Sequence, residues 1–158
     1  MDEPWPLFIT NYLLDIPPEA NEKMYYGPYN AILYSAFPLT QRFIVCPQTY
    51  PLETRQSMDF TIEYIVQVGR TPVMAVEVKR ARVYDTIQAR ADADDQVRER
   101  LFSMGNTFRV PRFHIVSVLG TRCCVYSYNT NTLSITPPRI VPTNLTLVED
   151  LAPAERWN

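Results

Sequence analysis

With 158 residues, 46% of them hydrophobic, the chain is long enough to fold as one globular domain with a sizeable core. It contains no apolar run of roughly 18 residues, so no transmembrane helix is predicted, and its acidic start lacks the basic and apolar regions of a secretory signal. The net charge of −2 argues against a generic nucleic-acid binder.

Cysteine and histidine usage indicates the cellular setting. The three cysteines, Cys46, Cys123 and Cys124, form a poor disulfide framework, so we expect a reduced, intracellular protein with no membrane partner. Because there is no CxxC spacing and no second histidine, a structural zinc site is not expected. The single histidine, His114, opens a predicted strand and is interpreted as structural.

The N-terminal part predicts an arm and a helix. Residues 1–18 form a proline-rich arm with a short helix at 8–14. Residues 19–36 form a helix that ends before Pro38. Because Gly27-Pro28 interrupts its pattern, this helix is either kinked or divided into two pieces.

Three strands follow. The first, at 42–46, is closed by Pro47 and leads into a polar loop at 47–57. The second, at 59–68, alternates apolar and polar residues, and a turn signal at 69–72 joins it to the third, at 71–80, so these two form an antiparallel hairpin.

The third strand is apolar on both faces except at its end, where Glu77 and Lys79 stand two residues apart and therefore share a face. A strand of this kind is central, with layers above and below. Charge is rare in such strands unless it is paired or binds a metal. The two residues form either a structural ion pair at a strand end or a functional site.

A helix of about 20 residues comes next, opened by an Asp85–Gln88 capping box and ending near Gly105. Its apolar stripe is Val97, Leu101 and Met104. Its predicted solvent-exposed side carries Asp92, Asp94, Asp95, Arg98 and Glu99.

Two further strands, at 114–119 and 123–128, are joined by a turn and followed by a loosely structured tail at 129–158 that we expect to pack on the core and cover an edge. A helix between two strands can act as a crossover that makes them parallel. We therefore expect an α/β domain whose core, residues 19–128, is a mixed β-sheet flanked by helices in the order helix-strand-strand-strand-helix-strand-strand.

Several polar residues of this core suit hydrolysis of a phosphodiester. Asp59 opens the hairpin, Glu77 and Lys79 close it, and Gln96 lies on the helix that follows. Two carboxylates on neighbouring strands can hold Mg²⁺, with the Val78 carbonyl as a further ligand. Lysine beside that metal can orient or help deprotonate an attacking water.

Basic residues gather in the same half of the chain. Between Lys79 and Arg122 there are nine basic and five acidic residues, a local balance of +4. Arg80, Arg82 and Arg100 are candidates for phosphate contacts, since arginine suits bidentate binding of phosphate. On charge alone, a solvated helix face with ion pairs is the preferred interpretation.

Asp59 followed by Glu77-Val78-Lys79 resembles the D…(D/E)xK signature of the PD-(D/E)xK nuclease superfamily, whose core has the same element order. Gln96 and Arg100 resemble its Q-x-x-x-(Y/R) helix motif, and the stretch around them is similar to small single-domain fungal members. The resemblance implies a restriction-endonuclease-like fold, Asp59 and Glu77 as ligands of Mg²⁺ or Mn²⁺, and Lys79 as the catalytic lysine. It assigns Gln96 either to support of the site or to contact with the substrate backbone, and it leaves room for a first-helix acid, Glu22 or Glu19.

The function implied is metal-dependent cleavage of nucleic acid, with DNA expected ahead of RNA and a homodimer as one possible assembly. The alternative is a nuclease-fold protein without catalysis that serves as a binding or scaffold module. With a turn at 69–72, simple pairing sets Asp59 opposite residues 80–82. Sharing one ion with Glu77 therefore requires a bulge, strong bending or a tip nearer Val68.

Overall fold

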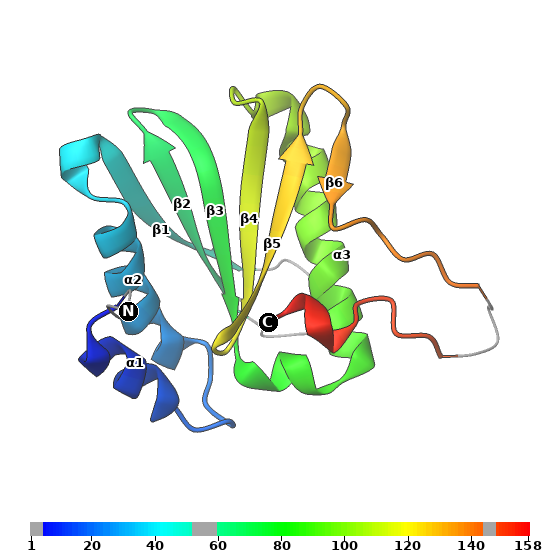
Figure 1. Cartoon of the computed structure of the whole chain (residues 1–158), viewed down its shortest axis with the longest axis horizontal. Coiled ribbons are helices and arrows are strands. Elements are labelled where there is room, and N and C mark those ends of the chain that lie inside the picture. The colour runs from blue at the N-terminus through cyan, green and yellow to red at the C-terminus, as the bar shows by residue number, and fades with distance from the viewer. Residues whose placement is uncertain (1–4, 52–59, 144–147) are drawn as a thin grey trace.

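The computed structural model of the chain describes residues 5–51, 60–143 and 148–158, and Asp59 lies outside them. At residues 48–51 and 60–63 the backbone is described and the side chains are not. One sheet passes through the middle of the molecule, with α1 and α2 on one side and α3 on the other (Figure 1). In the described part, no helix is long and apolar enough to cross a membrane.

The described helices are α1 (Leu7–Leu14), α2 (Lys23–Ala36) and α3 (Ile87–Met104). The strands are β1 (Phe43–Pro51), β2 (Phe60–Val68), β3 (Thr71–Lys79), β4 (Arg112–Leu119), β5 (Arg122–Asn129) and β6 (Ser134–Thr136), and they lie in this order across the sheet. The β3–β4 pair is parallel and every other neighbouring pair is antiparallel. These pairings confirm the α/β class, the hairpin and the helical crossover.

Two predicted boundaries in the first half are wrong. The α2 helix begins at Lys23 and continues through Pro28 as one element. Strand β1 does not end at Pro47 but runs to Pro51, which replaces part of the predicted loop. Proline is tolerated there because β1 lies at the edge of the sheet and, among the described strands, pairs with β2 alone. On an edge strand, a proline whose nitrogen faces the open side removes no hydrogen bond of the sheet.

The start of α3 also differs from the expectation. Asp85 does not cap the helix, because it ends the short 3₁₀ helix at Ala81–Asp85. Thr86 is the N-cap, with extended backbone angles and a hydroxyl that accepts a 3.2 Å hydrogen bond from the Ala89 amide. The helix ends at Met104, next to the predicted Gly105.

The sheet has a core on each face. On the α2 side, Tyr25 and Leu33 pack against Val76, Val78 and other alternate strand residues. On the α3 side, Val97 and Leu101 pack against Ala75 and its neighbours. Because side chains alternate along a strand, Glu77 and Lys79 lie on the same face as Ala75, beneath α3.

The C-terminal part is more ordered than the sequence indicates. It contributes β6, which pairs with β5, and it returns across α3 so that Trp157 and Ala152 are fully buried. The prediction that Asp94 and Arg98 lie on the solvent-exposed side of α3 is therefore wrong, since each is only 3% exposed. The Arg156 guanidinium donates a 2.6 Å hydrogen bond to Asp94, so the tail covers these charges and pairs with them.

Candidate functional site

Three of the predicted site residues converge at the carboxyl end of β3. Glu77 and Lys79 are 5% and 8% exposed, and Gln96 is half-buried on α3. The Lys79 Nζ atom lies 3.3 Å from Glu77 Oε1 and donates a 2.6 Å hydrogen bond to Gln96 Oε1. A lysine therefore links a carboxylate of the sheet to an amide of the helix.

Burial of this ion pair costs free energy. Removing two charges from water carries a desolvation penalty of several kcal/mol per ion, and a buried pair often stabilises no more than apolar residues of the same size. Glu77 and Lys79 are therefore poorly explained as a device for stability.

The strand register places two further residues next to Glu77. Glu77 is paired with Glu63 on β2 and with Ser117 on β4. Residues opposite each other in neighbouring strands share a face of the sheet. The register thus sets two acid positions, 63 and 77, across one ladder, although the side chain of Glu63 lies outside the described part.

The predicted partnership of Asp59 with Glu77 falls outside the described residues. A bulge does occur in the hairpin, but it lies near the tip, between Val66 and Gln67. Below it the register sets Glu63 opposite Glu77. Sequence reasoning did not select Glu63, because the register that sets it opposite Glu77 cannot be predicted from the sequence.

The other predicted residues surround this centre. Val78 is fully buried on the opposite face and is paired with Ile62 and Val118. The predicted phosphate contacts are Arg80 and Arg100, both half-buried, and Arg82, which is exposed on the 3₁₀ helix. Glu22, at the N-cap of α2, lies 3.8 Å from Arg80, so the first-helix acid meets the residue that follows Lys79.

Ser117 and Trp157 form a buried contact beside the site that sequence reasoning did not find. Both are fully buried, and the Trp157 indole donates a 3.3 Å hydrogen bond to the Ser117 hydroxyl. Ser117 is the β4 neighbour of Glu77, so the end of the chain covers the sheet next to the ion pair. Nothing local in the tail signals this contact, which depends on the path of the chain over α3.

The donor set suits a hard cation in its chemistry. Carboxylates and a backbone carbonyl are the ligands that Mg²⁺ accepts, and this ion needs only one or two carboxylates because it keeps several waters. Within the described ranges, no group of three or more histidine, cysteine, aspartate or glutamate side chains gathers to hold a metal. The positions that fit are Glu77, residue 63 opposite it on β2, and the Val78 carbonyl.

Comparison of the chain with known proteins does not show which family it belongs to. No protein-family model, curated protein or solved structure matches the chain. The likeness to the PD-(D/E)xK superfamily therefore stays a prediction that depends on five residues and the order of the elements.

Proposed function

We propose that the chain is a Mg²⁺-dependent nuclease with a restriction-endonuclease-like fold, acting on DNA ahead of RNA. The observation that carries this proposal is the convergence of Glu77, Lys79 and Gln96 at the end of β3. It is supported by the observed element order, in which a helix, three antiparallel strands, a crossover helix and a parallel strand follow one another.

Each residue has a role in the proposed reaction. Glu77, either Asp59 or Glu63, and the Val78 carbonyl would hold the cation, which when bound would polarise the phosphodiester and favour ionisation of a water. Lys79 orients the attacking water and stabilises the negative charge that develops on the phosphate. Gln96 fixes the Lys79 ammonium through the 2.6 Å hydrogen bond. Arg80, Arg82 and Arg100 contact neighbouring phosphates.

A second candidate is a nuclease-fold module that binds without cleaving. Two observations favour it. Lys79 is already engaged by Glu77 and Gln96, which is also what a purely structural ion pair would show. The chain as a whole carries a net charge of −2, whereas nucleic-acid binding usually requires a basic surface.

A cleavage assay separates the two candidates. Purified protein is incubated with single- and double-stranded DNA and with RNA, with Mg²⁺ or Mn²⁺ and then with EDTA. We expect cleavage that requires the metal and stops with EDTA. Lys79→Met should lower the rate on the order of 10²–10³-fold, which is the usual effect of removing one charge-stabilising group.

The chain offers a matched control in Lys23→Met, because Lys23 is the other lysine and is exposed at the start of α2. This variant should cleave at the wild-type rate. Comparing Asp59→Ala with Glu63→Ala then identifies the second carboxylate that holds the metal. Binding without cleavage in any metal would favour the scaffold, and full activity in a folded Lys79→Met protein would refute the proposed site.

A further inference from the structure

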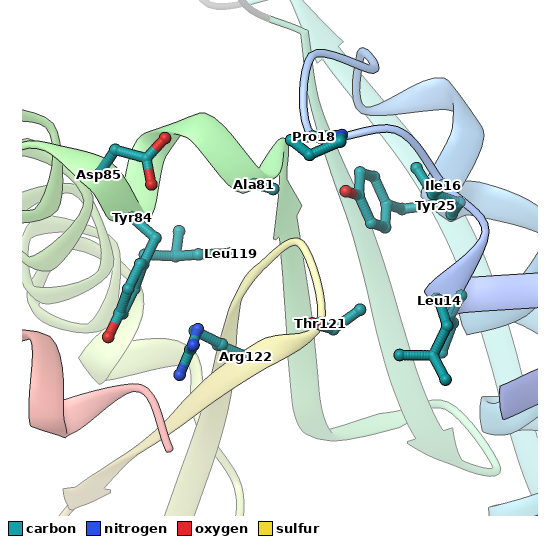
Figure 2. Close-up of a pocket in the computed structure, with 11 residues that line it drawn as sticks. Leu14, Ile16, Pro18, Tyr25, Ala81, Tyr84, Asp85, Leu119, Thr121 and Arg122 are labelled. Carbon is teal, nitrogen blue, oxygen red and sulfur yellow. The ribbon is translucent and has the colours of Figure 1, made fainter. Parts of the chain in front are cut away.

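A pocket of about 380 Å³ opens beyond the carboxyl ends of β3 and β4. Figure 2 shows Tyr84, Asp85 and Arg122 on one wall, and Leu14, Ile16, Pro18 and Tyr25 on the other. Leu119 lies beside Tyr84, and Ala81 and Thr121 lie between the two walls. In open α/β sheets, ligands commonly bind outside the carboxyl ends of the strands, so the position itself is suited to binding.

The floor of this pocket is joined directly to Lys79. Leu119 is the β4 partner of Lys79, and the Gly120 amide donates a 2.9 Å hydrogen bond to the Lys79 carbonyl. Gly120 also packs closely on Ala81, since a Cβ built on it would lie 2.7 Å from the Ala81 Cβ. A ligand held in the pocket is therefore held in fixed relation to the end of β3.

The walls differ in chemistry. The Arg122 guanidinium lies 4.4 Å from the centre of the Tyr84 ring, which restrains an otherwise exposed cation as a planar donor group. Asp85, an exposed carboxylate next to Tyr84, can accept a hydrogen bond from an amino group. The facing wall is mainly apolar. A ligand that matches both walls has one anionic group, one planar apolar body and a hydrogen-bond donor.

A nucleotide has these three properties. We propose that the pocket binds the nucleotide next to the scissile phosphodiester, with its phosphate at Arg122, its base on the apolar wall, and a base amino group toward Asp85. This assignment rests on the proposed function, because the scissile bond is placed at Glu77 and Lys79. Arginine is suited to the phosphate because its planar fork can donate two parallel hydrogen bonds.

Binding is tested in EDTA, so that no cleavage interferes. Deoxyadenosine monophosphate, deoxyadenosine and inorganic phosphate are titrated into the isotope-labelled protein, and the backbone amide resonances are followed by NMR. We expect the monophosphate to shift the amides of Ala81, Gly120 and Thr121 and to bind about tenfold more tightly than either fragment. Arg122→Gln should weaken its binding by a similar factor.

Arg139→Gln is the matched control, because Arg139 is also an exposed arginine and is paired with Asp95 instead of lining the pocket. A second arm measures the affinity for a short oligonucleotide, which Arg122→Gln should lower and Arg139→Gln should not. If the monophosphate leaves the three amides unshifted, or binds there while Arg122→Gln leaves oligonucleotide affinity unchanged, the assignment is wrong.

The two proposals fail in different ways. A protein that binds the monophosphate and the oligonucleotide through Arg122 but never cleaves would contradict the nuclease and leave the pocket supported. A protein that cleaves, with neither ligand affected by Arg122→Gln, would contradict the pocket alone.

Discussion

The helix α3 takes part in two buried polar clusters that differ in their chemistry. The strand-end cluster joins Glu77, Lys79 and Gln96. The tail cluster consists of Asp94, Arg98, Tyr126 and Arg156. In it the Asp94 carboxylate accepts hydrogen bonds of 2.6 and 3.1 Å from Arg98, 2.7 Å from Tyr126 and 2.6 Å from Arg156.

The contrast shows how a structural charge differs from a candidate catalytic one. Burial alone would raise the pKa of Asp94, but hydrogen bonds from Arg98 and Tyr126 and the charges of Arg98 and Arg156 lower it below its usual value. Both of its oxygens accept hydrogen bonds from protein donors, which lie on α3, β5 and the tail, and these bonds hold the three elements together. The strand-end cluster instead brings together a carboxylate, an ammonium group and a neutral amide at the carboxyl end of β3.

The largest expected effect comes from removing the centre of the tail cluster. Asp94→Ala leaves the buried Arg98 and the partly buried Arg156 without their carboxylate, and breaking a buried pair in this way costs roughly 3–5 kcal/mol of unfolding free energy. Urea denaturation followed by circular dichroism measures the loss. The control is Asp95→Ala, whose exposed ion pair with Arg139 contributes at most about 1 kcal/mol. Equal losses in the two variants would show that the tail cluster does not hold the fold.

The same cluster predicts a dependence on pH. Because the pKa of Asp94 is lower in the folded protein than its usual value of 3.8, the unfolded chain binds the proton more readily. The contribution of Asp94 is therefore complete above that value and is lost as the pH falls through the folded pKa. Urea denaturation between pH 5 and pH 2, at intervals of about half a unit, should show a shallower acid decline in Asp94→Asn than in the wild type. Parallel declines would contradict the assignment.

A smaller effect is expected from the amide of the strand-end cluster. Gln96→Leu removes the acceptor of the Lys79 hydrogen bond with little change in volume, so we expect cleavage to fall roughly 10–100-fold, in line with the 1.5–3 kcal/mol of a hydrogen bond to a charged group. A positioning role predicts a lower kcat with little change in KM, and recovery in Gln96→Glu, which keeps an acceptor. Glu99→Ala, on the exposed side of the same helix, is the control. A change confined to KM would instead favour substrate binding.

Much of the fold could be predicted because its signals are local. The alternation of β2, the turn before Thr71 and the change of period after Lys79 predict the hairpin and the crossover, and the structure has both. The errors arise where tertiary context overrides a local signal. In the sequence, Pro47 predicts the end of a strand, yet in the structure it is tolerated within the edge strand β1.

The same distinction holds for the polar residues. Glu77 and Lys79 stand out because charge is unusual at the end of an apolar strand, so their position was predictable. Asp94 and Arg98 look like an ordinary solvated pair on a helix, but Tyr126 of β5 and Arg156 of the tail both pair with Asp94, and the two side chains are buried. Glu63 was not predicted as a site residue for a different reason. The bulge and the tip of the hairpin set the strand register, and neither can be predicted from the sequence.

The smallest expected change is in the stability of the double variant Glu77→Gln/Lys79→Met. Both charges leave together, so neither partner remains buried and unpaired, and the unfolding free energy should stay within about 1 kcal/mol of the wild type or rise. Cleavage should be lost entirely. The same urea titration measures the stability of the double variant, and the nuclease assay measures its cleavage. Each single variant should be less stable than the double one, because it leaves an uncompensated charge beneath α3. A double variant as unstable as Asp94→Ala would mean that the strand-end cluster, like the tail cluster, serves the fold.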